Sequence, residues 1–298
     1  MIENVLTLNP IKKRVYQRDT AFTEAIGALR DLWPASCCLT SFFWNHAALL
    51  LRPEAIVARR SRFVFPMLRA HGLTPVCVRR IHLAPEQGGL LWRYQANVMT
   101  QGHYLLLRRL MSAGPSIYVI LKDHSNRTST PATGHVTYLK GPTLVAKRRP
   151  LHFRSLAGPG IANLLSYIHA SDDPADFLRE LAVFFPRSAL VDVVREAAEG
   201  QDRTSDALAV IGKAELYAPK GVLPSDRNAL ERDVNVLLSP EDLAVRQNWI
   251  ELVRLAQTTR SYVSGEAYDT RAASIPDDKK YLARLDDHLI FPEFGPGF

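Results

Sequence analysis

The stretch Tyr167-Ile-His-Ala-Ser-Asp-Asp-Pro-Ala-Asp-Phe-Leu-Arg-Glu-Leu-Ala-Val-Phe-Phe185 decides the fold, because it predicts a short strand, an exposed His169 and a capped helix. Pro174 suits the first turn of a helix, where a missing N–H costs no hydrogen bond, and Asp172 or Asp173 can cap that turn. Apolar side chains then recur on one helical face, at Phe177, Leu178, Leu181, Phe184 and Phe185. A histidine at a strand-to-helix junction, with a serine two residues on, is well placed for chemistry on an anion.

Apolar runs and helical patterns alternate along the rest of the chain. Strands are predicted at 47–51, 73–83, 115–122 and 164–168, and helices at 19–33, 56–70, 86–111 and from Pro174 onward. Pro66 should kink the second helix or delay its start, Gly72 should cap it, and Gln101-Gly102 should break the third. Residues 124–159 are predicted to be rich in loops. This order predicts an α+β fold, a ferredoxin-like split βαβ sandwich.

The chain divides into three predicted segments. Residues 1–45 form an N-terminal extension, residues 46–200 the main domain, and residues 201–298 a mainly helical C-terminal extension. A helix is expected near 240–258, followed by an apolar tail at 289–298 that should pack on the core or on a neighbouring subunit. The role of this last segment stays open at this stage.

Composition limits the classes of function. The chain has 298 residues, of which 47% are hydrophobic, enough for one large domain or two small ones. A net charge of +7 fits a solvated basic surface or a binder of phosphates. No dense tract of Lys and Arg is interleaved with aromatic residues, so the sequence predicts no dedicated nucleic-acid surface.

The three cysteines favour a reducing compartment. Cys37, Cys38 and Cys77 make neither a disulfide framework nor a zinc-site spacing, which predicts a cytoplasmic protein. The N-terminus lacks the basic-then-apolar order of a signal peptide. The apolar run at 36–51 is short for a bilayer and is interrupted by Asn45-His46, so a buried strand with its lead-in is expected there and no membrane partner.

The opening stretch resembles the active-site signature of nucleoside diphosphate kinases. That signature is roughly Asn-x-x-His-Gly/Ala-Ser-Asp-Ser, followed by a helix that bears a glutamate. Five residues match it position by position, namely His169, Ala170, Ser171, Asp172 and Glu180. Asp173 stands where the second serine is expected, and Ser166 stands where the asparagine is expected.

Further motifs of the family follow in the right order over about 155 residues of this chain. Ala47–Ile56 resembles the first strand with its Lys-Pro-Asp motif, and Gly102–Pro115 resembles the helix that ends in a Ser-Gly-Pro turn. Gly141-Pro-Thr143 resembles the Gly-x-Thr loop, and Arg154 follows Thr143 by eleven residues. The resemblance implies the family's ferredoxin-like fold, in agreement with the pattern of elements.

The resemblance also implies a chemistry. Neutral imidazole is a competent nucleophile near pH 7, so the γ-phosphoryl of a nucleoside triphosphate would move to His169 and then to a nucleoside diphosphate, in a ping-pong reaction. Glu180 would hold the other ring nitrogen and Ser171 would bond near it. The family's substrate-binding positions correspond here to Arg52, Tyr94, His103, Tyr104, Thr143, Arg154 and Ser166. Mg²⁺ would bridge the nucleotide phosphates with no metal-ligating residues, and the chain would form a homo-oligomer.

Departures from the family pattern leave alternatives open. Arg52 replaces a lysine, which puts a planar fork where the family has a compact ammonium. A second phosphate-binding arginine is expected before Gly141, but a direct count lands on Thr137; Lys147, Arg148 or Arg149 could supply that charge. Three functions therefore compete: a nucleoside diphosphate kinase, a specialised phosphotransferase with another acceptor, and a degenerate nucleotide-binding or assembly module. The acceptor, the base preference and the oligomer size are not fixed by the sequence.

Overall fold

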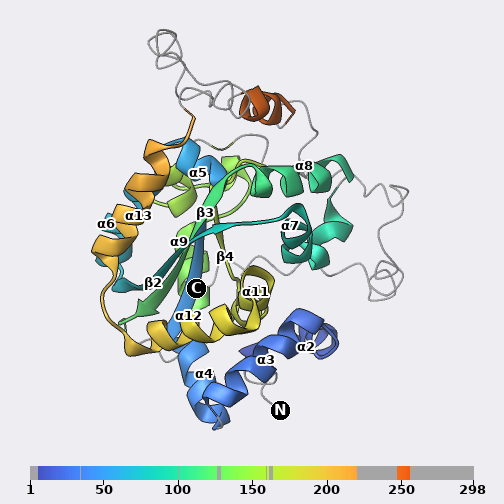
Figure 1. Cartoon of the computed structure of the whole chain (residues 1–298), viewed down its shortest axis with the longest axis vertical. Coiled ribbons are helices and arrows are strands. Elements are labelled where there is room, and N and C mark those ends of the chain that lie inside the picture. The colour runs from blue at the N-terminus through green and yellow to red at the C-terminus, as the bar shows by residue number, and fades with distance from the viewer. Residues whose placement is uncertain are drawn as a thin grey trace.

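The protein is built around a four-stranded antiparallel sheet with helices on both faces (Figure 1). The computed structural model describes residues 6–33, 35–99, 101–125, 129–158, 160, 164–219 and 247–255. The strands are β1 (His46–Leu51), β2 (Leu73–His82), β3 (Pro115–Asp123) and β4 (Ile168–Ala170). Their order is β2-β3-β1-β4, and every neighbouring pair is antiparallel. The predicted α+β ferredoxin-like architecture is confirmed.

The helices fill the connections between the strands. In chain order they are α2 (Pro10–Tyr16), α3 (Thr20–Leu32), α4 (Ser36–Asn45), α5 (Pro53–Val57), α6 (Phe65–Ala70), α7 (Pro85–Leu91), α8 (Gln101–Ser112), α9 (Ala132–Lys140), α10 (Phe153–Ala157), α11 (Pro174–Phe184), α12 (Arg187–Glu199) and α13 (Thr204–Leu216). Short 3₁₀ turns lie at η1 (Ser61–Val64), η2 (Arg93–Val98) and η3 (Val145–Lys147). Residues 247–255 are also helical.

The central strand β1 is buried on both faces, which explains its unbroken apolar sequence. Successive side chains of a strand point to opposite faces, so Leu49 and Leu51 enter one hydrophobic cluster while Leu50 enters the other. The first cluster includes residues of α5, α8, α9 and α13, and the second includes residues of α3, α4, α11 and α12. Two helical layers are needed because neither face of this strand is polar.

Several element boundaries differ from those expected. The predicted second helix is divided: α5 ends at Val57, just before Arg59 with its φ of +53°, and α6 begins at Phe65 with Pro66 in its first turn. The break between α7 and α8 begins at Trp92 rather than at Gln101. Strand β4 is only three residues long and contains His169, which therefore lies within the strand rather than beyond it.

Helices α4 and α9 are among those that the sequence prediction missed. Helix α4 occupies the segment expected to lead into β1, and contacts distant in sequence stabilise it, among them an edge-on contact of Phe43 with Phe177 at 5.0 Å between ring centroids. Helix α9 lies in the segment expected to be loop-rich. Its sequence includes Gly134 and β-branched residues, which are weak helix formers, yet it buries Val136 and Leu139 against the core.

Helices that precede β1 and helices that follow α11 pack on the rest of the described structure. Helix α3 lies against α11 and α12, while α12 and α13 lie along β2, where the Arg203 amide donates to the Pro75 carbonyl at 2.7 Å. Trp249, in the helical residues 247–255, is 1% exposed and belongs to the same cluster as α13. The rest of the helix expected near 240–258, and the tail at 289–298, lie outside the described residues.

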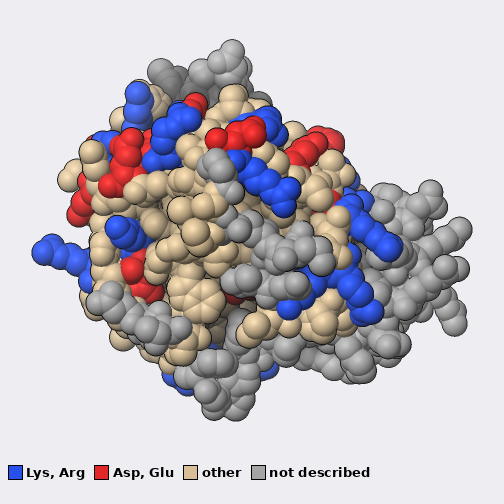
Figure 2. All heavy atoms as spheres, turned by 90° about the horizontal axis from the view of Figure 1, so that it is seen from below, with Lys and Arg blue, Asp and Glu red and all other residues tan. Residues whose placement is uncertain are grey.

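The surface carries both signs of charge. On the face shown in Figure 2, Lys and Arg side chains lie among Asp and Glu side chains over much of the described area. Among the described helices, none combines the length and the apolar character that crossing a bilayer requires.

Candidate active site

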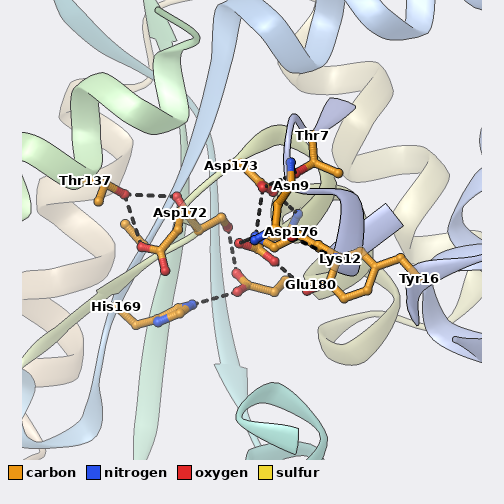
Figure 3. Close-up of polar contacts among 12 residues, drawn as sticks. Thr7, Asn9, Lys12, Tyr16, Thr137, His169, Asp172, Asp173, Asp176 and Glu180 are labelled. Carbon is orange, nitrogen blue, oxygen red and sulfur yellow. Dashed lines mark hydrogen bonds and ion pairs between the residues drawn. The ribbon is translucent and has the colours of Figure 1, made fainter. Parts of the chain in front are cut away.

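His169, Glu180 and Ser171 form one hydrogen-bonded group at the junction of β4 and α11. Nε2 of His169 lies 2.9 Å from Oε1 of Glu180, and the Ser171 hydroxyl donates to Oε2 of the same carboxylate at 2.6 Å (Figure 3). A carboxylate only accepts hydrogen bonds, so the imidazole proton is held on Nε2. Nδ1 is then the ring nitrogen with a lone pair available for reaction.

Local sequence explains why these three residues meet. Asp173 caps α11 by accepting from the Asp176 amide at 2.9 Å, and Pro174 occupies its first turn. The helix therefore begins five residues after His169 and carries Glu180 back toward the strand. Before the strand, Tyr167 adopts a φ of +67°, which is rare for a residue with a side chain. Such strain persists only where the surroundings impose it, as it commonly does at functional sites.

Arg52 directly follows β1 and is almost fully buried, at 3% exposure. Its Nη1 donates to the Ser166 hydroxyl at 2.6 Å and its Nη2 to the Leu164 carbonyl at 3.2 Å. Its Nε lies 2.9 Å from a carboxylate oxygen of Glu54, which also accepts from the Tyr167 amide at 3.1 Å. Burial lowers the pKa of Arg52. Two residues predicted to bind substrate, Arg52 and Ser166, are thus bonded to each other.

Arg154, on α10, lies next to the backbone of β4. Its Nη1 donates to the Gly141 carbonyl at 2.7 Å and its Nε to the Ile168 carbonyl at 3.2 Å. Burial, together with the charges of Arg148 and Arg52, lowers the pKa of Arg154 to about 9. Burial, with help from Arg52, lowers the pKa of Arg148 to about 10. We call Arg52, Arg148 and Arg154 the cationic cluster.

Trp92 links the cationic cluster to the histidine, and sequence reasoning missed it. The Arg52 guanidinium lies 5.5 Å from the centre of the indole. The imidazole of His169 packs edge-on against the same indole, with 5.7 Å between ring centroids and 76° between planes. Trp92 stands two residues before the predicted Tyr94, so a small change of register would have found it.

The three residues predicted near a base have different surroundings. Tyr94 is 8% exposed, its hydroxyl donates to Asp19 at 2.6 Å and the Arg179 guanidinium lies 4.9 Å from its ring. It therefore lies between Asp19, which caps α3, and Arg179 of α11. His103 is buried near Arg52, and burial, aided by that charge, lowers its pKa to about 4. Tyr104 donates to the Gly89 carbonyl at 3.2 Å and packs α8 on α7.

Comparison with known proteins identifies the domain that carries this group. Residues 45–190 match the family model described as nucleoside diphosphate kinase. Residues 45–190 are therefore a divergent domain of the nucleoside diphosphate kinase family. No curated protein matches the chain significantly.

Three solved structures of the family are similar to this chain. The Aquifex aeolicus nucleoside diphosphate kinase is 20% identical, with a TM-score of 0.40, over 48% of this chain and 95% of its own. An NDP kinase from Pyrobaculum aerophilum is 22% identical, with a TM-score of 0.38, over 49% of this chain and 98% of its own. A halophilic nucleoside diphosphate kinase from Halobacterium salinarum, in complex with CDP, is 19% identical, with a TM-score of 0.37, over 47% of this chain and 86% of its own.

At Thr137, the position counted for the family's second phosphate-binding arginine, the side chain faces the segment after His169. Its hydroxyl donates to the Ser171 carbonyl at 3.2 Å (Figure 3). One turn on, the buried ammonium of Lys140 donates to Asp172 at 2.8 Å and to the Ala170 carbonyl at 2.9 Å. Burial raises the pKa of Asp172, but Lys140 outweighs it and holds that pKa well below its usual value. These residues support the backbone of this nucleoside diphosphate kinase domain rather than extend the cationic cluster.

The predicted loop threonine is positioned by the cationic cluster. The Thr143 carbonyl accepts from Nη2 of Arg148 at 2.9 Å. Thr143 follows Gly141, whose φ of +77° and whose lack of a Cβ let the His152 ring pack closely. The loop of the nucleoside diphosphate kinase domain is therefore fixed from both sides by side chains.

Proposed function

We propose that this chain moves the γ-phosphoryl group of a nucleoside triphosphate to Nδ1 of His169 and then to a nucleoside diphosphate. The observation that carries the proposal is the 2.9 Å contact between Nε2 of His169 and Glu180, next to the cationic cluster. A histidine with one nitrogen held by a carboxylate has a fixed tautomer and a fixed orientation, which a nucleophile requires.

The reaction has two balanced steps. The Nδ1 lone pair attacks the γ-phosphorus, the bond from that phosphorus to the bridging oxygen breaks, and a nucleoside diphosphate leaves with the electron pair. The proton on Nε2 stays in place, where Glu180 stabilises the positive charge that the ring gains. A second nucleoside diphosphate then attacks the phosphohistidine with its terminal oxygen and restores the neutral imidazole. Catalysis of this kind depends mainly on positioning and charge stabilisation.

Charge balance supports an anionic substrate. The cationic cluster brings three guanidinium groups together, and among the described residues Glu54 is the carboxylate that pairs with one of them, Arg52. Buried charge without a partner is costly, so a polyphosphate would compensate the excess. We assign phosphate contacts to Arg154 and Thr143, and to Arg52 if its side chain turns from Ser166.

Other parts of the substrate follow from the same geometry. His103 and Tyr104 lie on the helix next to Arg52 and would flank the base, and His103 is neutral at pH 7 because its pKa is about 4. Ser166 holds Arg52. We also propose that Mg²⁺ arrives bound to the nucleotide phosphates, in keeping with the family resemblance.

Labelling tests the proposal. The protein is incubated with γ-labelled ATP and Mg²⁺, and the acid-labile label is measured on wild type, His169→Ala and His82→Ala. His82 is exposed on β2, so its variant is the matched control. Label on wild type and on the His82 variant, absent from the His169 variant and chased onto added nucleoside diphosphate, is expected. A wild-type protein that binds ATP and takes no label would overturn the proposal.

All three arms of the Arg52 guanidinium already contact protein groups, namely Ser166, Leu164 and Glu54. This observation favours a second candidate function, a module that binds nucleotides without phosphoryl transfer. Normal affinity for ATP together with an unlabelled His169 would support that candidate. A screen of nucleoside diphosphates separates a specialised acceptor from broad use, since equal turnover of all common diphosphates argues against specialisation.

Assembly, location and domain limits complete the proposal. We expect a homo-oligomer in the cytoplasm, in keeping with the family resemblance and with three unpaired cysteines. We also expect a domain at 46–200 between an N-terminal extension (1–45) and a C-terminal one (201–298). Sedimentation of the purified protein tests the first expectation, imaging of a tagged chain the second, and limited proteolysis the third.

A further inference from the structure

Arg148 lies in the loop between α9 and α10, and two arms of its guanidinium are fixed. Nε donates to the Pro142 carbonyl at 3.1 Å and Nη2 to the Thr143 carbonyl at 2.9 Å. Because the guanidinium is planar and its donors form a rigid fork, these two bonds also fix the direction of the third arm, Nη1.

That third arm is buried and has no hydrogen-bond partner among the described residues. Gly160 lies close to it, since a Cβ atom at that position would come within 2.6 Å of Nη1. Gly160 also has a φ of +72°, a conformation that glycine adopts without strain. A buried charged donor that lacks an acceptor is rare in folded proteins and destabilises them, which indicates that a ligand provides the acceptor.

The surroundings of Arg148 select an anion. The charge of Arg52 helps burial to lower the pKa of Arg148, and the charges of Arg148 and Arg52 help burial to lower the pKa of Arg154, so the three guanidinium groups lie close to one another. Within the described residues Arg148 makes no ion pair, whereas its neighbours Lys147 and Arg149 are exposed to solvent. The ligand must therefore be strongly acidic and must reach a loop that already carries Thr143.

We propose that Arg148 is a phosphate-binding residue of this site, with Nη1 donating to a non-bridging oxygen of a di- or triphosphate. The inference rests on the proposed function for the identity of the substrate. It goes beyond that function because it names Arg148 as the third phosphate-binding guanidinium. The carbonyl groups of Pro142 and Thr143 orient that guanidinium.

Binding of inorganic tripolyphosphate tests the inference without a base, a sugar or a transfer step. Its affinity is measured by calorimetry for wild type, Arg148→Met and the matched control Arg149→Met, whose charge is exposed one residue away. Loss of a charge-assisted hydrogen bond predicts a weakening of about 10- to 100-fold for Arg148→Met. The control should change the affinity less than about threefold, because exposed charges are screened.

Each outcome decides the inference. Equal affinities of wild type and Arg148→Met, or no binding of tripolyphosphate by wild type, would overturn it. If Arg148→Met does not fold, Arg148→Lys decides, because an ammonium keeps the charge but lacks the planar fork that directs separate donors to the two carbonyls and the phosphate. Weaker binding by that variant supports the inference, and unchanged binding refutes it. Labelling of His169 is measured separately, so failure of the proposed function and failure of this inference are distinguishable.

Discussion

Replacing Lys12 by methionine should destabilise the packing of α2 against α11, the helix that carries Glu180. Lys12 is 3% exposed, and its ammonium lies 2.7 Å from both Asp173 and Asp176 on α11 (Figure 3). Asp176 also accepts from the Tyr16 hydroxyl at 2.5 Å. Burial lowers the pKa of Lys12, but the two carboxylates outweigh it and hold that pKa above its ordinary value.

The size of the effect follows from what the variant leaves behind. Lys12→Met removes the cation between two buried carboxylates, and breaking a buried ion pair in this way costs about 3–5 kcal/mol of unfolding free energy. For a chain of this size that corresponds to a fall in Tm of roughly 10 °C. The matched control is Lys13→Met, one residue along α2, which makes no ion pair within the described residues and should change the free energy by less than about 0.5 kcal/mol.

Urea denaturation and thermal melting of both variants measure the difference. A double variant, Lys12→Met with Asp176→Asn, should recover part of the loss, because it removes one of the stranded charges. A loss below about 1 kcal/mol for Lys12→Met is the value expected of an exposed pair, and would refute the docking of the N-terminal extension described above.

Three further predictions concern the same site. Glu180→Ala should slow labelling of His169 by about 10- to 100-fold, by analogy with other residues that orient a reactive histidine, whereas the exposed Glu199→Ala should not; equal rates would contradict the role of Glu180. Burial and Asp176 raise the pKa of Asp173 from 3.8 to about 6. Between these two pH values the folded state binds a proton at Asp173 that the unfolded state has lost. The stabilisation from this group is therefore full below about pH 4 and is lost as the pH rises through about 6. In urea titrations, Asp173→Asn should remove this dependence of the free energy of unfolding on pH. An unchanged dependence would show that a different group titrates in this range. Ser166→Ala removes the hydroxyl that accepts from Nη1 of Arg52 at 2.6 Å, and should lower the free energy of unfolding by about 1.5–3 kcal/mol in the same assay. A change near zero would contradict the hydrogen bond between Arg52 and Ser166.

Local signals made the strand-to-helix junction predictable from the sequence. The cap at Asp173, the proline at the first turn and the apolar face of α11 all act within a few residues of one another. The apolar run of β1 and the turn glycine Gly72, which has a φ of +69°, are equally local. Because each signal lies inside its own element, the order of the strands and several of the helices could be inferred.

Contacts between distant segments could not be predicted in this way. The hydroxyl of Tyr94 bonds to Asp19, 75 residues away, and Lys12 bonds to α11 across more than 160 residues. No local pattern in the sequence predicts either contact. Helix α4 depends on similar long-range packing of Phe43, which explains why the sequence predicted only a lead-in to β1 there. The pairing of Arg52 with Ser166 belongs to the same class.

The position of the phosphate on the His169 ring tests the central claim most directly. Glu180 holds Nε2 at 2.9 Å, so Nδ1 is the nitrogen that should react. After brief incubation of wild type with ATP and Mg²⁺, ³¹P NMR of the protein distinguishes the two phosphohistidine isomers, and peptide mapping locates the residue. One phosphoryl group on Nδ1 of His169 is expected; a phosphoryl group on Nε2, or none on His169, would show that Nδ1 is not the nucleophile.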